Sequence, residues 1–219
     1  MDLEPGEGGG GRVSHRDIRR FDKWAPTYDD NWLQPNFFEP VHEATLRLAA
    51  RVAPRPRRVL DVGCGTGALM RRAADRFPGA KLVGADPAPG MVAAAREAMK
   101  DGASVSFVCA PVESLPFDDG EFDLVLSTVS FNHWEDQQAG FEEIARVLAP
   151  GGSLVLADIF AASWLRVMLL PMRPHGTFRT PARIERMLRS AGLVPGNRET
   201  VLTFFLGLPV VSAVPASKP

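Results

Sequence analysis

Cysteine is scarce in this chain. Cys64 and Cys109 are the only two among 219 residues, which is too few for a disulfide framework. The sequence therefore indicates a reducing compartment, and we expect a cytoplasmic protein. Histidine is also rare, with four residues scattered along the chain. Because no two of them have the spacing of a metal-ligand pair, we expect no metal site.

The chain also lacks a strong charge of one sign and a long apolar run. Its formal net charge is −1 at pH 7, so the basic surface typical of nucleic-acid-binding proteins is missing and we expect no such partner. Two apolar stretches, 153–172 and 201–215, are interrupted by charged residues, glycine and proline. Neither contains about 20 uninterrupted apolar residues, so we expect no insertion into a membrane.

Three regions of the chain differ in composition. Residues 1–16 are acidic and rich in glycine without an apolar segment, so we expect a disordered tail rather than a signal peptide. Residues 17–53 are rich in aromatic side chains and have apolar residues at helical spacing in their second half, which predicts a helical arm. Residues 54–219 contain no sign of a second core and are expected to form one domain. Monomer and homodimer both remain open.

Strands and helices are expected to alternate in that domain. The expected strands are 58–63, 81–86, 105–110, 122–130 and 153–160, and the expected helices are 68–77, 89–100 and 137–148. Such alternation predicts parallel β-α-β units with right-handed crossovers, and hence an α/β fold with a doubly wound sheet. After a helix at 181–193, the strands 198–205 and 209–216 are separated only by 206–208. Since so short a connection cannot hold a crossover helix, we expect an antiparallel hairpin at the sheet edge.

The stretch "VLDVGCGTG", residues 59–67, carries the main functional signal. Its glycines follow a strand and precede a helix, which is typical of a nucleotide site, and with Ala68 they also match the dinucleotide pattern of nicotinamide-dependent oxidoreductases. Asp86 ends the next expected strand, where a carboxylate accepts both hydroxyls of an adenosine ribose, or caps the following helix. Asp61 discriminates better, because a carboxylate repels a pyrophosphate and attracts an amino group and a sulfonium. It favours S-adenosylmethionine.

Four segments together resemble one family. "VLDVGCGTG", "VGADPAPGM", "ESLPFDDGEFDLVLSTVSFNHW" and "EEIARVLAPGGSLVLAD" are similar, in order and spacing, to class I S-adenosylmethionine-dependent methyltransferases. The most similar branch acts on small molecules and includes the ubiquinone and menaquinone biosynthesis methyltransferases. The resemblance implies a Rossmann-like seven-stranded sheet of order 3-2-1-4-5-7-6 with strand 7 antiparallel. It also makes 54–219 the S-adenosylmethionine-binding domain and 17–53 its lid.

The resemblance implies a role for individual residues. The segment "FDKWAPTYDD" resembles the family's A-x-x-Y-D segment, so that its tyrosine is expected to close over the cofactor. The implied cofactor-binding residues are Tyr28, Asp61, Gly63, Gly65, Gly67, Asp86, Pro87, Met91, Val112, Glu113 and Ser127. Two departures from the family pattern are present. Residues 110–112 replace a frequent Gly-Asp-Ala, which removes an acidic contact to adenine, and Asn132 replaces the first histidine of a frequent His-His-Trp.

The acceptor is expected between the arm and residues 159–180. His133, just beyond the fourth strand, is the candidate general base, with support of the loop as its structural alternative. The expected pocket residues are Trp24, Trp32, Phe38, His42, Asp158, Trp164 and Met168. Their apolar majority favours a lipophilic or aromatic small-molecule acceptor. Two other interpretations stay open: a protein of this fold that binds the cofactor without methylating, and a nicotinamide-dependent oxidoreductase.

Overall fold

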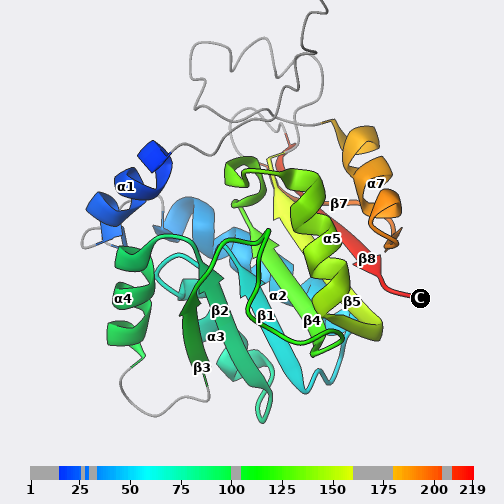
Figure 1. The fold of residues 1–219 in the computed structure, drawn as a ribbon. Helices are drawn as coiled ribbons and strands as arrows, with labels where there is room; N and C mark the ends of the chain where they lie inside the picture. Colours follow the sequence, from blue (N-terminus) through cyan, green and yellow to red (C-terminus); the bar gives the residue numbers. More distant parts are fainter. Residues whose placement is uncertain (1–14, 26–27, 30–33, 100–104, 160–179, 204–208) are drawn as a thin grey trace, which may run out of the picture.

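A single mixed sheet forms the centre of the molecule (Figure 1). The computed structural model describes residues 15–25, 28–29, 34–99, 105–159, 180–203 and 209–219. The strands are β1 Arg58–Val62, β2 Lys81–Asp86, β3 Val105–Cys109, β4 Phe122–Thr128, β5 Leu148–Asp158, β6 Val194–Pro195, β7 Glu199–Thr203 and β8 Pro209–Ser217. They lie in the order β3-β2-β1-β4-β5-β8-β6, with β7 also paired to β8.

The edge of the sheet beyond β8 explains why the structure has eight strands where seven were expected. The first five strands are parallel neighbours, whereas β8 runs antiparallel to β5. On its other side β8 pairs antiparallel with β7 along 209–213 and with β6 at 216–217. The edge strand of the sheet is therefore divided in two by residues 196–198. Apart from that division, the predicted order and the predicted antiparallel hairpin are confirmed, because β7 and β8 are joined directly by 204–208.

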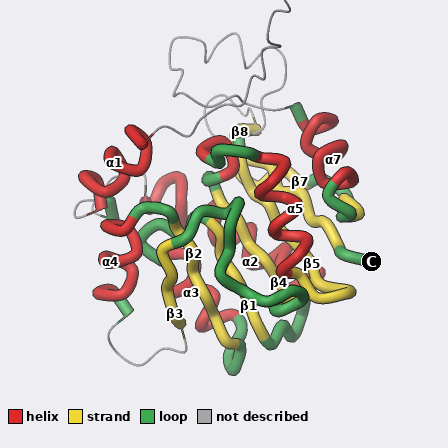
Figure 2. Tube along the Cα trace, in the orientation of Figure 1, coloured by secondary structure: helices red, strands yellow, loops and turns green. Residues whose placement is uncertain are grey.

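Helices cover both faces of the sheet (Figure 2). They are α1 His15–Trp24, the short η2 Gln34–Phe38, α2 Glu39–Val52, α3 Ala68–Arg76, α4 Pro89–Ala98, the 3-10 turn η3 Phe131–His133, α5 Gln137–Val147 and α7 Pro181–Ser190. The sequence predicted a helix only in the second half of the arm. It missed α1 because most of this segment is charged, although its few apolar residues, Ile18, Phe21 and Trp24, recur at helical spacing. In the part of the chain that the structure describes, no helix is long and apolar enough to cross a membrane.

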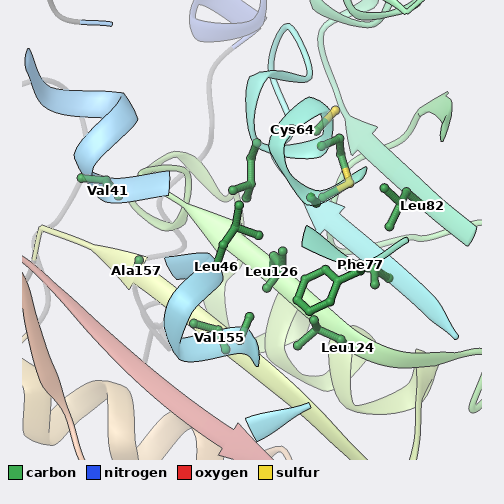
Figure 3. Packing of buried hydrophobic residues seen from close by; sticks show 14 of the residues in the cluster. Val41, Leu46, Cys64, Phe77, Leu82, Leu124, Leu126, Val155 and Ala157 are labelled. Atoms are coloured by element: carbon green, nitrogen blue, oxygen red, sulfur yellow. The ribbon is translucent and has the colours of Figure 1, made fainter. Parts of the chain in front are cut away.

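Two apolar clusters lie on opposite faces of the sheet, because side chains alternate along each strand. Leu124 and Leu126 of β4 belong to the cluster that also contains residues of α2, α3 and α4. Val125, between them, belongs to the cluster with α5 and α7. Figure 3 shows Leu46 of α2 near Val155 and Leu126 of the sheet. With both faces covered, the central strands read as apolar runs, as parallel sheets require.

The parallel arrangement decides where a ligand site lies. Strands β1, β2 and β4 are adjacent in the sheet and point the same way, so that the turns after their carboxyl ends come together. The order of connections reverses between β1 and β4, which makes this edge a topological switch point. At this edge the glycine stretch follows β1, and Asp86 is the last residue of β2.

Candidate functional site

A cavity of about 560 Å³ opens at this switch point. The arm contributes Ile18, Arg19, Phe21, Tyr28 and Phe38; the turns after β1 and β2 contribute Gly63, Gly65, Asp86, Pro87, Ala88 and Met91; the remaining lining is Pro111, Val112, Glu113, Thr128, Val129, Ser130, His133, Trp134 and Glu135. The structure thus brings most of the expected cofactor residues, together with His133 and Phe38, to one cavity. Ligand pockets of this size and mixed lining are common in proteins.

The three glycines of the turn serve three different purposes, although all have positive φ. A Cβ atom at Gly63 would lie 2.4 Å from the Cβ atom of Ser130, so this position admits no side chain. A Cβ atom at Gly67 would lie 2.8 Å from the Phe107 ring, so this glycine permits close packing of α3 on the sheet. At Gly65 an added Cβ atom meets nothing within 4 Å, and the residue borders the cavity. Gly65 is the position where a ligand can approach the backbone.

Asp86 connects the two turns. Its Oδ2 accepts a hydrogen bond from the Gly65 amide at 2.9 Å, and its Oδ1 accepts one from the Ala88 amide at 2.9 Å. Both oxygens keep further lone pairs toward the cavity, where a ribose diol would donate two hydrogen bonds. Burial raises the pKa of this carboxyl above its usual value, while the two amide bonds lower it. Asp86 thus bonds the amide of the residue that precedes α4 and not an amide of the helix itself, so it joins two turns and does not act as the predicted helix cap.

Asp61 lies one layer below the cavity. It is 1% exposed, and among the residues that the structure describes its Oδ1 has no hydrogen-bond partner. Burial, followed by the nearby charge of Asp86, raises the pKa of Asp61 well above its usual value. An unpartnered carboxylate oxygen beneath a glycine turn is costly unless a donor or a positive charge comes near. The site therefore fits a ligand that carries an amino group and a sulfonium above this acid.

The end of β4 forms the opposite wall and was largely missed by the sequence analysis. Val129 has φ +52°, an unusual conformation for a β-branched residue, and it borders the cavity. The Ser130 hydroxyl is 2.8 Å from the Ser127 hydroxyl, donates to the Val62 carbonyl at 3.1 Å and accepts from the Trp134 indole at 3.3 Å. Ser127 itself is fully buried beneath this wall rather than in it. A Ser-rich strand end is the signal that could have pointed to Ser130.

His133 meets the arm across the cavity. Its ring and that of Phe21 make an edge-to-face contact with centroids 5.2 Å apart. Tyr28, from the arm, borders the same cavity, and burial with the charges of Asp29 and Asp86 raises its pKa to about 12. Tyr28 is therefore a neutral phenol near pH 7 and a poor proton acceptor, and the assignment of His133 as the general base stays a prediction.

The segment that departs from the family pattern still borders the cavity. Pro111 and Val112 contribute to its lining, and the Ala110 amide donates to the Asp86 carbonyl at 3.1 Å. Glu113 borders the cavity as well, with its Oε1 accepting from the Asp136 amide at 3.1 Å. Backbone and apolar groups are thus present where an adenine ring is expected, without an acidic side chain at residue 111.

Three residues expected in the acceptor pocket lie elsewhere. Trp24 is 45% exposed, with the Arg20 guanidinium 4.2 Å from its ring centroid. His42 borders a second cavity. Asp158 is buried because it holds the η3 turn, accepting from the Phe131 amide at 2.9 Å and the Asn132 amide group at 2.8 Å. These three residues therefore do not border the cavity, and their place in an acceptor pocket between the arm and residues 159–180 stays a prediction. The other expected pocket residues, Trp32, Trp164 and Met168, lie outside the described residues.

The buried imidazole of His42 gives the protein a pH-dependent stability. The residue is 6% exposed and its Nδ1 has no partner. Burial, with the nearby charges of Arg72 and Arg71, lowers its pKa to about 4. The unfolded chain, with a histidine pKa of about 6.5, takes up a proton between pH 6.5 and 4 that the folded chain excludes. This residue therefore lowers the free energy of unfolding as the pH falls through that range.

We expect His42→Leu to remove that contribution. From pH 7 to pH 5 the wild type should lose about 2 kcal/mol more in free energy of unfolding than the variant. Urea unfolding of both proteins at the two pH values measures the difference. Contributions of other groups, such as the carboxyl of Asp158, whose pKa burial raises to about 7, cancel in this comparison. Equal pH dependence in the two proteins would contradict the assignment.

Comparison with known proteins gives a consistent picture. Residues 60–156 match the family model described as "Methyltransferase domain". The demethylmenaquinone methyltransferase of Thermus thermophilus is 40% identical over 146 residues, covering 65% of this chain and 61% of that protein. The ubiquinone biosynthesis O-methyltransferase of a Chelativorans species is 31% identical over 216 residues, covering 85% of this chain and 83% of that protein.

Solved structures share the fold. The 1,6-didemethyltoxoflavin-N1-methyltransferase of Burkholderia thailandensis, solved with its substrate and S-adenosylhomocysteine, has a TM-score of 0.71 at 19% identity, covering all of this chain and 93% of that one. At this identity the likeness concerns the fold alone. The chain spans about half the length of several curated relatives, from 44% to 61%.

Proposed function

Because the chain belongs to the S-adenosylmethionine-dependent methyltransferases, we propose that it transfers a methyl group from this cofactor to a small lipophilic or aromatic acceptor. One observation carries the proposal. A single cavity joins the Gly65–Asp86 turns, which suit an adenosine, to an apolar wall formed by the arm and the end of β4. A donor and an acceptor bound in such a cavity would lie next to each other.

Five residues would hold the cofactor. Gly65 offers open backbone, Asp86 would accept from the ribose hydroxyls, and the buried carboxyl group of Asp61 would attract the charged methionine part. Val112 and Met91 would contact adenine from either side. The bound cofactor supplies an electrophilic methyl group on a positively charged sulfur. Asp61 and Asp86 would stabilise that charge in the bound cofactor, and their raised pKa values would fall when it binds.

The protein accelerates the reaction mainly by alignment. Displacement at a methyl group requires the acceptor atom in line with the departing sulfur, and holding the two partners in a dry pocket contributes several kcal/mol. Phe21, Phe38 and Trp134 line the acceptor side and exclude water. His133 borders the same space and would take a proton from a hydroxyl acceptor. An activated ring carbon would need little from this histidine.

The names of the relatives refer to two acceptor classes. Some refer to demethylmenaquinone and to ubiquinone biosynthesis, and others to malonyl-[acyl-carrier protein]. Of the two, we infer the first, because an aromatic or quinone-like ring suits the edge-to-face contact of Phe21 and His133. We place the enzyme in the cytoplasm, where its two cysteines, both free in this structure, would stay reduced. Asp61 disfavours the nicotinamide-dependent oxidoreductase. No observation favours a protein that binds the cofactor without methylating.

Calorimetric titration tests the cofactor first. We expect saturable binding of S-adenosylmethionine and of S-adenosylhomocysteine, and no binding of NADH as the control. Transfer of a labelled methyl group to a panel of phenols, hydroxyquinones and aliphatic acids then tests the acceptor. Methylation of the aromatic members would support the proposal. Tight cofactor binding without any transfer would favour the non-methylating interpretation, and binding of NADH alone would refute the family function.

A further inference from the structure

Two carboxylates of the arm bind the two turns that hold the cofactor. Asp22 of α1 accepts a hydrogen bond at its Oδ1 from the Gly90 amide at 2.8 Å. Gly90 lies in the first turn of α4, directly after the Asp86 turn. The residue before this helix, Ala88, makes no side-chain cap bond, so that Asp22 supplies from another element the acceptor that helix N-termini usually obtain locally.

Asp29 does the same at the glycine turn. Its Oδ1 accepts from the Thr66 hydroxyl at 2.6 Å, and its Oδ2 accepts from Arg71 at 2.9 Å. Arg71 also donates to the Thr66 carbonyl at 2.7 Å. Thr66 lies between Gly65 and Gly67 and is only 4% exposed. A change in the position of Asp29 therefore acts on the backbone that borders the cofactor.

Apolar packing of the arm near these bonds is modest. Ile18, Phe21 and Tyr28 are partly buried against a small cluster formed by Ala25, Ala88 and Met91. Beside Asp29, the contact between the arm and α3 includes a cavity of about 330 Å³ lined mainly by charged and polar side chains. An element with few buried apolar contacts opens at low cost, so polar bonds decide its position.

We propose that Asp22 and Asp29 are positioning residues that couple the acceptor wall to the cofactor turns. Phe21 and Tyr28, which precede the two aspartates in the chain, contribute to that wall. The hydrogen-bond partner of Asp22 lies in the turn after β2, and that of Asp29 lies in the turn after β1. Cofactor that orders the turns then stabilises the seated arm, and the arm strengthens cofactor binding by the same factor, because such coupling is reciprocal. This proposal takes the identity of its ligand from the proposed function, whereas the hydrogen bonds of Asp22 and Asp29 do not depend on that function.

Gly90→Ala is the sharpest test. An added Cβ atom would lie 3.0 Å from Oδ1 and 3.2 Å from Cα of Asp22, which pushes the arm backbone away. Alanine in the first turn of α4 favours the helix itself, so the domain should remain as stable as the wild type. Gly90 does not border the cavity. We therefore expect faster amide exchange at residues 15–25 in the free protein, and cofactor bound about 10-fold more weakly.

Asp22→Ala and Asp29→Ala should act in the same direction, and Asp22→Asn should largely restore the wild type because its amide oxygen can still accept from Gly90. Glu43→Ala is the matched control. It removes one negative charge from the arm region, where Glu43 forms an ion pair with Arg47 on the surface of α2, 3.3 Å away. The control should leave both exchange and affinity unchanged.

The outcomes separate the two proposals. Unchanged exchange at 15–25 in Gly90→Ala and both alanine variants would overturn the positioning role, whatever ligand the protein binds. Faster exchange with unaltered S-adenosylhomocysteine affinity would show that the bonds seat the arm without coupling, and would also overturn it. If the wild type binds no S-adenosylhomocysteine, the proposed function fails, and the coupling to the cofactor fails with it.

Discussion

Asp86→Ala should weaken the binding of S-adenosylmethionine by about 100-fold, which corresponds to about 3 kcal/mol. The carboxylate is buried and already bridges the Gly65 and Ala88 amides. Alanine removes the acceptor for two ribose hydroxyls and leaves those two amides without their partner. Charge-assisted hydrogen bonds are stronger than neutral ones, so their loss at a buried site has a large effect. Titration calorimetry measures the affinity directly.

Two comparisons isolate the ribose contact from damage to the turns. Asp86→Asn keeps one oxygen acceptor at the same position and should lose less affinity than the alanine variant. Glu142→Ala removes an exposed acid from α5, where it accepts a hydrogen bond from Gln138 of the same helix, and this variant should bind cofactor as the wild type does. If Asp86→Ala stays folded, by circular dichroism and thermal unfolding, and binds with unchanged affinity, the cofactor site lies elsewhere.

Gly63→Ala should lower the free energy of unfolding by about 3 to 5 kcal/mol, a large fraction of a typical domain's stability. Two costs add here. Residue 63 has φ +73°, which side-chain-bearing residues rarely adopt, and the new methyl group would lie 2.4 Å from the Cβ atom of Ser130. Ser130 cannot easily move, because its hydroxyl is bonded to Ser127, Val62 and Trp134.

Gly65→Ala is the matched variant two residues away. It shares the positive φ, at +53°, but its added Cβ atom meets nothing within 4 Å, so we expect a loss of only about 1 kcal/mol in stability. Because Gly65 borders the cavity, its methyl group should instead reduce cofactor affinity. Urea unfolding and calorimetry of both variants separate the effects. Equal destabilisation by the two substitutions would contradict the distinct roles assigned to these glycines.

The fold was predictable because the signals for it are local or repeated along the chain. Apolar runs of strand length alternate with amphipathic helices, and the chirality of crossovers leaves few arrangements for such a chain. The short connection expected at 206–208 excluded a parallel pair, which placed the antiparallel β8 correctly. Asp86 and Gly65 could be placed together for a similar reason: each lies at the carboxyl end of a parallel strand, and neighbouring parallel strands end at the same edge of the sheet.

Contacts between distant segments were not predictable. The bonds of Asp22 to Gly90 and of Asp29 to Thr66 join residues 68 and 37 positions apart, and no spacing rule connects such pairs. Similarly, nothing local distinguishes an aspartate at a strand end that faces a ligand from one such as Asp158 that holds a neighbouring turn. The burial of His42 likewise depends on how α2 packs against α3.

Short-range chemistry therefore determined the architecture, the place of the ligand turns and the identity of the cofactor class. Tertiary packing decided which polar side chains reach the cavity and which are used to hold other elements. The physical reason is that a buried polar group must be paired, and its partner is chosen by the three-dimensional arrangement of the sheet, the turns and the arm. Here that arrangement assigns two acids of the arm to the cofactor turns and leaves Asp61 beneath them with an unpartnered oxygen.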